Sequence, residues 1–288
     1  MISGIEKTMI HSAKKNGIKK IGLALGGGGA RGFAHLGAIA RLAEIGFPVH
    51  CVAGTSIGAI VGGIFAAGTI DRAFAWCREP DWKKLPSLFF ETHLTRKALI
   101  KGDKIEQILR DLIPVARFRD MPMPFAAVAT DFYTGERVVM RDGDVVSAVR
   151  ASMSIPGVFR PVEREGRVLV DGGLVDPLPI AACREQGADA VVAIDINPPS
   201  VASSRKPFAK VNIFDVILGS FRIFNREMTR VAIASGSAPD VLLAPGVGDV
   251  LALDFRHGER IMELGRQAVD ANRGALEALM ARLDPQTI

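Results

Sequence analysis

Ser56 lies in the sequence GTSIG at 54–58, which has the GxSxG spacing of a nucleophilic serine. The apolar run 49–53 precedes it and the helix-like run 57–67 follows it, so the serine falls where a strand turns sharply into a helix. Gly54 and Gly58 allow such a turn to close without steric clash, and the N-terminus of a helix favours a developing alkoxide. The pattern predicts nucleophilic catalysis by Ser56, although a glycine-rich packing turn would use the same residue types.

A second glycine-rich segment, GGGGARG at 26–32, follows an apolar run and opens a helix. Backbone N–H groups of such a loop converge beside the positive end of a helix and bind negative charge. Acyl transfer needs both a nucleophile and an oxyanion site, so this loop and the GTSIG motif support each other. Nucleotide binding is disfavoured, because the second strand ends without the acid of a dinucleotide site and Phe33 stands where a P-loop needs lysine.

Asp171 is the third candidate, since it follows the apolar run 168–170 and precedes two glycines. A carboxylate at a strand end can act as a base for the serine, but Asp-Gly is also a common hairpin signal. A free Asp has a pKa of about 3.9, so a Ser56–Asp171 pair needs a desolvated cleft. A triad with His257 is the alternative, because the three residues follow the α/β-hydrolase chain order. His35 falls inside a predicted helix and is interpreted as structural.

The motifs GGGGARG, GTSIG and DGGLVDPLP, in that order, resemble those of bacterial patatin-like phospholipases, close to the neuropathy-target-esterase group. The resemblance covers 20–197 and the segment around 253–255, whereas 198–250 match no pattern. It implies that Ser56 is the nucleophile and Asp171 the base of a catalytic dyad. It also implies an oxyanion hole formed by the backbone amides of Gly27, Gly28 and Gly29, with Arg31 and Gly32 supporting that loop. Asp176 stands where relatives commonly have Asn.

The rest of the sequence predicts the strands and helices that position these residues. Predicted strands at 21–25, 49–53, 125–130, 137–140, 168–170 and 190–194 alternate with predicted helices at 30–45, 56–67, 104–112 and 179–186. This alternation predicts an α/β layered fold with a largely parallel central sheet, and the resemblance implies a three-layer α/β/α arrangement. We expect an N-terminal extension, 1–19, and one catalytic domain, 20–288, with a variable segment at 198–250 and a single closing helix at 257–283.

The composition is that of an ordinary globular chain, with 288 residues, 48% hydrophobic residues and a net charge of +5. Three cysteines without CxxC spacing argue against a disulfide framework or zinc site, and we expect no metal and no cofactor. With one Tyr and two Trp, we expect no nucleic-acid partner. The run 49–70 lacks charged residues and has about the length of a membrane span, but Thr55-Ser56 divides it. Because no signal-peptide pattern opens the chain, we expect a cytoplasmic protein.

The sequence therefore predicts a serine lipid acyl hydrolase (phospholipase, lysophospholipase or esterase). The lipid substrate comes from the resemblance, whereas the residues alone indicate only a serine hydrolase. A non-enzymatic scaffold that retains the fold is the competing class. The segments 211–224 and 85–90 are candidates for peripheral contact with the inner face of a membrane, because apolar residues in 211–224 recur at helical spacing among basic ones. Packing on the core and a homo-oligomer contact are the alternatives for 211–224.

Overall fold

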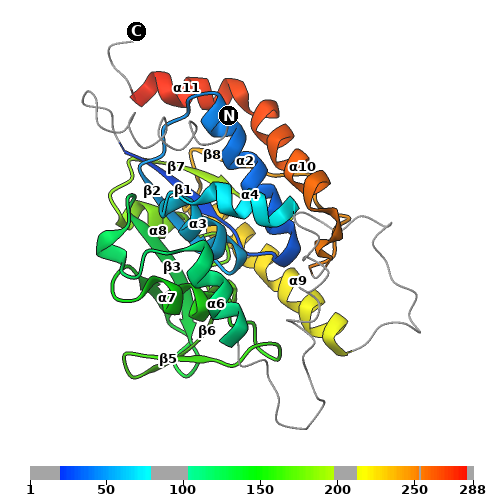
Figure 1. Cartoon of the computed structure of the whole chain (residues 1–288). Helices are drawn as coiled ribbons and strands as arrows, with labels where there is room; N and C mark the ends of the chain where they lie inside the picture. The colour runs from blue at the N-terminus through cyan, green and yellow to red at the C-terminus, as the bar shows by residue number, and fades with distance from the viewer. Residues whose placement is uncertain (1–19, 79–102, 198–212, 253, 284–288) are drawn as a thin grey trace.

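The computed structural model describes residues 20–78, 103–197, 213–252 and 254–283, so the expectations for 1–19, 85–90 and 198–210 lie outside the described residues. Within these ranges the frame is one eight-stranded sheet in the order β5-β6-β3-β2-β1-β7-β8, with β4 also paired to β3 (Figure 1). The strands are β1 (Ile21–Leu25), β2 (Cys51–Thr55), β3 (Phe125–Asp131), β4 (Arg137–Met140), β5 (Val162–Arg164), β6 (Arg167–Asp171), β7 (Ala190–Ile194) and β8 (Val241–Leu243).

The sheet is largely parallel, as predicted. Strands β1, β2, β3, β7 and β8 run in one direction, while β4 and β6 pair antiparallel with β3, and β5 pairs antiparallel with β6. The described helices are α2 (Phe33–Glu44), α3 (Ile57–Ala66), α4 (Ile70–Arg78), α6 (Asp103–Leu112), α7 (Val145–Ser152), α8 (Ile180–Glu185), α9 (Ile213–Ala234), α10 (Gly258–Ala271) and α11 (Arg273–Leu283).

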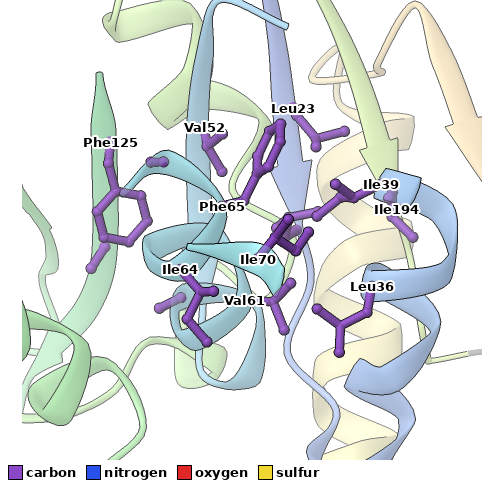
Figure 2. Close-up of a cluster of buried hydrophobic side chains, with 14 of the residues drawn as sticks. Leu23, Leu36, Ile39, Val52, Val61, Ile64, Phe65, Ile70, Phe125 and Ile194 are labelled. Atoms are coloured by element: carbon purple, nitrogen blue, oxygen red, sulfur yellow. The ribbon is translucent and has the colours of Figure 1, made fainter. Parts of the chain in front are cut away.

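Successive side chains along a strand point to opposite faces of the sheet, so the strands contribute to two hydrophobic cores, one larger than the other. Leu23 and Val52 face a large core, where they meet side chains of α2 and α3 such as Ile39 and Phe65 (Figure 2). The opposite face carries small residues such as Ala24, which pack with α8. Small side chains let α8 approach the sheet closely, and helices on both faces give the α/β/α layers that the sequence predicts.

Several boundaries differ from the prediction. Strand β2 runs from Cys51 to Thr55 rather than over 49–53, because pairing with β1 begins at Gly22 opposite Cys51. The helix predicted from residue 30 opens as a 3-10 turn at Gly29–Gly32 and becomes α-helical at Phe33. The predicted single closing helix is wrong, since Asn272 separates α10 from α11.

The uncharged run 49–70 is divided between β2 and α3, with the break at Ser56. Among the described residues, no helix combines the length and the apolar character that crossing a bilayer requires. Four elements were absent from the sequence prediction, namely α4, α7, β5 and β8. Of these, α7 and its C-terminal end matter most for the candidate site.

Candidate active site

Ser56 occupies the tight turn between β2 and α3. Its backbone has φ 58° and ψ −123°, a region that non-glycine residues rarely adopt and that strand-to-helix nucleophile turns use. A Cβ at Gly54 would lie 2.2 Å from the Gly58 carbonyl oxygen, and a Cβ at Gly58 would lie 2.1 Å from that of Leu25. Both glycines are therefore required by close backbone contacts, in agreement with the sequence prediction for this motif.

The register of β3 explains how Asp171 reaches Ser56. Strand β2 runs parallel to β3 and ends with Thr55 opposite Val128. Strand β6 runs antiparallel and ends with Asp171 opposite Ala129, the next residue of β3. Strand β4 takes the other edge of β3, so β2 and β6 share one edge and their carboxyl ends meet head to head. Residues 115 positions apart in the chain are thereby brought together.

The Ser56 hydroxyl donates a hydrogen bond to Asp171 Oδ2 at 2.6 Å. The other carboxylate oxygen, Oδ1, accepts from the Gly173 amide at 2.8 Å. Asp171 is fully buried, and burial raises its pKa to about 7, even though the hydrogen bonds from Ser56 and Gly173 favour the charged form. A carboxylate with a pKa near neutrality is suited to accept a proton from serine, which is the condition that the sequence argument required of a Ser–Asp pair.

Ser152, at the end of α7, fixes the backbone of the nucleophile. Its hydroxyl accepts from the Ser56 amide at 3.0 Å and donates to the Val128 carbonyl at 2.6 Å. Both ends of this bridge are buried. Ser152 falls within the range 20–197 that the resemblance covers, but the sequence analysis gave it no role, because no local pattern predicts a contact with Ser56.

The glycine loop supplies fewer free amides than predicted. The Gly27 amide donates to the Pro177 carbonyl at 3.0 Å, so its assignment as an oxyanion donor is wrong in this structure. Gly27 instead permits close packing, since a Cβ there would lie 3.2 Å from Ser56 Cβ. Among the described residues, the amides of Gly28, Gly29 and Ile57 meet no acceptor, and all three residues line the same cavity as Ser56.

Arg31 supports this loop from inside the protein. Its guanidinium donates to the carbonyl oxygens of Gly28 and Ile196, each at 3.1 Å. Burial lowers its pKa to about 10, and the positive charge of Arg222 contributes to that lowering. Gly32 is required by a different contact, because a Cβ there would lie 2.2 Å from Ile57 Cγ1. The predicted supporting roles of both residues thus have a geometric basis.

Neither the triad candidate His257 nor the buried His35 is hydrogen-bonded to the Ser56–Asp171 pair. His257 precedes α10, is more than half exposed, and has Asp254 as its nearby acid at 4.0 Å. His35 is buried in α2 and bonds the Gly26 carbonyl at 2.8 Å through Nε2. Burial lowers the pKa of His35 to about 4, so this imidazole stays neutral and serves the loop structurally.

Ser56 opens onto a largely apolar cavity. One part of its wall comes from α3 and α6, with Ile57, Ile60, Val61, Ile64, Ile105 and Leu109. Another part comes from α9, through Leu218, Phe221, Arg222 and Asn225. These four residues follow the i, i+3, i+4, i+7 spacing of a single helix face. The segment that matched no sequence pattern therefore forms part of the wall around the serine.

Asn225 links α9 to the loop that carries Asp171. With its amide oriented to satisfy both neighbouring carbonyls, Nδ2 donates to Gly173 at 2.7 Å and to Phe221 at 3.1 Å. Gly173 in turn donates its own amide to Asp171. Asn225 is buried at 2% exposure, so water does not compete for these bonds. This contact was missed by sequence reasoning, since α9 carries no motif.

Comparisons with known proteins show what this chain is similar to. The pattern of the patatin-like phospholipase family matches residues 23–184, which include both Ser56 and Asp171. An uncharacterized NTE family protein of Mycobacterium bovis is 38% identical over 65% of this chain and 51% of its own length. A patatin-like phospholipase domain-containing protein of Caenorhabditis elegans is 32% identical over 85% of this chain and 20% of its own.

The chain spans about half the length of the mycobacterial relatives that it matches. Among solved structures, VipD from Legionella pneumophila superposes with a TM-score of 0.58 at 14% identity, covering 92% of this chain and 67% of VipD, which is a likeness of fold. The match to the family pattern extends over more than half of the chain and includes the strand, loop and turn described above. This chain belongs to the patatin-like phospholipase family.

Proposed function

We propose that this protein is a serine acyl hydrolase that acts on lipid esters, with Ser56 as nucleophile and Asp171 as base. The observation that carries the proposal is the 2.6 Å hydrogen bond between Ser56 Oγ and Asp171 Oδ2, formed in a strained turn at the wall of an apolar cavity. Family membership supports lipid esters as the substrate class.

In the acylation step, Ser56 Oγ attacks the ester carbonyl carbon while its proton passes to Asp171. The carbonyl oxygen becomes an oxyanion, and we assign its donors to the amides of Gly28, Gly29 and Ile57. These three amides have no acceptor among the described residues and border the cavity at Ser56. Collapse of the tetrahedral intermediate breaks the ester C–O bond, and the leaving alcohol takes the proton from Asp171.

Deacylation repeats the same steps with water as the nucleophile. Asp171 removes a proton from the attacking water, the oxyanion forms again at the same amides, and the proton returns to Ser56 Oγ as the acid is released. One carboxylate thus serves as base and then acid in each half of the reaction. Its pKa of about 7 suits both roles, because the two protonation states are then close in free energy.

We also propose that α9 meets the lipid surface. Its inner face lines the cavity, whereas five apolar side chains on the helix are exposed, namely Ile213, Val216, Ile223, Phe224 and Val231. Arg226 and Arg230 are exposed on the same helix and suit anionic head groups. A helix with one face in the cavity and apolar side chains exposed offers a short path for an acyl chain.

We also propose a cytoplasmic location. The described cysteines Cys51, Cys77 and Cys183 are free thiols, as is usual in a reducing compartment.

A fluorophosphonate probe tests the nucleophile. We expect labelling of the wild-type protein that is lost in Ser56→Ala and strongly slowed in Asp171→Asn. The matched control is Ser237→Ala, which removes the hydroxyl of an exposed serine and should label normally. The same proteins are assayed for fatty acid release from phospholipid, lysophospholipid and simple esters. A folded protein that binds liposomes but neither labels nor hydrolyses any ester would have to be assigned to the scaffold class instead.

A further inference from the structure

Arg222 is the distinctive charged residue of the cavity wall formed by α9. It is half-buried and borders the same cavity as Ser56. Two other arginines of this helix, Arg226 and Arg230, both lie beside the carboxylate of Glu227, at 3.8 and 2.8 Å. No carboxylate among the described residues lies within ion-pair distance of Arg222. A half-buried guanidinium facing an apolar cavity is favourable only if an anion or water occupies its donors.

Arg31 also borders the cavity, but it is less suited than Arg222 to bind a ligand anion. Two of its five N–H groups donate to the carbonyl oxygens of Gly28 and Ile196, and the side chain is buried at 2% exposure. The charge of Arg222 is close enough to lower the pKa of Arg31, so the two guanidiniums repel each other across the loop. An anion held by Arg222 would relieve this repulsion. Of the two arginines that border the cavity, Arg222 is the one whose guanidinium has no partner among the described residues.

The other residues of the cavity wall indicate what kind of molecule would carry the anion that Arg222 binds. On α3 the residues Ile57, Ile60, Val61 and Ile64 form an apolar stripe along about 10 Å of helix. A ligand that fills the cavity thus has an apolar chain, a reactive ester at Ser56 and a negative group toward α9. A phosphate bound through the glycerol unit of a phospholipid has this arrangement.

We propose that Arg222 is a specificity-determining residue that binds the phosphate of a glycerophospholipid or lysophospholipid substrate. The inference rests on the proposed function, since it concerns the substrate of the same site. A guanidinium binds phosphate through two parallel, charge-assisted hydrogen bonds, a geometry that an ammonium group does not reproduce. Arg222 therefore selects phosphate-bearing esters over neutral esters that have the same acyl chain.

The test compares two substrates that share one acyl chain in the same mixed micelles: a lysophosphatidylglycerol and a monoacylglycerol. For Arg222→Gln we expect kcat/KM on the phosphate-bearing substrate to fall by about 10- to 100-fold, the range typical of a hydrogen bond to a charged group. On the neutral substrate we expect kcat/KM to be unchanged. Arg222→Lys should recover part of the loss. The control is Arg273→Gln, which changes an exposed arginine of α11 that does not border the cavity and should match the wild type on both substrates.

Three outcomes would overturn the assignment. An unchanged preference in Arg222→Gln shows that the guanidinium does not bind the phosphate. An equal loss on both substrates shows a structural role. If the variant changes only inhibition by free fatty acid, Arg222 binds the product carboxylate rather than the substrate phosphate. A wild-type protein that hydrolyses neither substrate, nor any other ester, refutes the proposed function itself and is thereby distinguished from these results.

Discussion

Replacing Asp171 by Asn should stabilise the fold while abolishing turnover. The substitution keeps the size of the side chain and an oxygen that can accept from the Gly173 amide, but it removes the base. It also removes the free-energy cost of holding a charge in a fully buried position. Stability and activity should therefore move in opposite directions at this single site.

The magnitude follows from the pKa of this group. Burial raises the pKa of Asp171 from its ordinary 3.8 to about 7. Between these two values the folded protein holds a proton that the unfolded chain has released, so the free energy of unfolding falls as pH rises from about 4 to 7. At about 1.36 kcal/mol per pH unit, the loss reaches about 4 kcal/mol. The difference in unfolding free energy between Asp171→Asn and the wild type should hence be largest above pH 7 and vanish near pH 4.

Urea unfolding of the wild type and of Asp171→Asn at pH 4, 6 and 8 measures this difference, and hydrolysis of a soluble ester at pH 8 measures activity. The matched control is Asp176→Asn, because burial also raises the pKa of Asp176 to about 6, yet this side chain does not border the cavity. The control should gain stability above pH 6 and keep its activity. A stability difference at Asp171 that does not depend on pH would refute the reasoning, and so would turnover by Asp171→Asn.

Three further predictions concern the same site. The kcat/KM of the wild type on a neutral soluble ester should rise with pH to a plateau, with a midpoint near 7, because Asp171 must be ionised to accept the serine proton; a flat profile from pH 5 to 9 would exclude this base. Ser152→Ala should lower kcat by about 10- to 100-fold, since it leaves the buried Ser56 amide and the Val128 carbonyl without partners; wild-type kcat in the variant would show that Ser152 does not position the nucleophile. Asn225→Ala should lower kcat by about tenfold on neutral and phosphate-bearing esters alike, because it removes the hydrogen bond that holds the Gly173 loop beside the Asp171 carboxylate. It should also move the midpoint of the pH profile. A variant that loses stability but keeps the wild-type midpoint would show that Asn225 has a packing role only.

The sequence was sufficient to predict the α/β frame and both members of the dyad candidate, but not their contact. Ser56 is encoded locally, because the glycines at 54 and 58 and the flanking apolar runs specify the turn. Asp171 could equally have ended a plain hairpin. What brings it to Ser56 is the antiparallel pairing of β6 with β3, which fixes Asp171 opposite Ala129. Strand pairing over such a separation depends on the register of a third strand, and no local pattern reports it.

The errors have physical causes of the same kind. Val49 is apolar and buried like a strand residue, yet the ladder with β1 begins only at Cys51, so composition placed β2 two residues early. Gly27 belongs to the predicted oxyanion loop by sequence, but its amide is satisfied by Pro177 from a distant segment. A glycine motif predicts a concave backbone; which of its amides remain free depends on the acceptors that tertiary structure brings against it.

Arg31 and Arg222 are both cationic residues beside the cavity, but the structure gives them different surroundings. Arg31 lies in the conspicuous glycine motif, but it is buried and two of its N–H groups donate to backbone carbonyls, so we interpret it as a residue that supports the loop. Arg222 lies on a helix without any motif, yet it faces the cavity with no carboxylate beside it among the described residues. The proposed dyad is positioned by strands and their turns, which lie inside the region that matches the family pattern. We propose that substrate selection falls to α9, which lies outside the region that matches the family pattern. Relatives with the same dyad should therefore differ in head-group preference according to what their counterpart of α9 presents to the cavity.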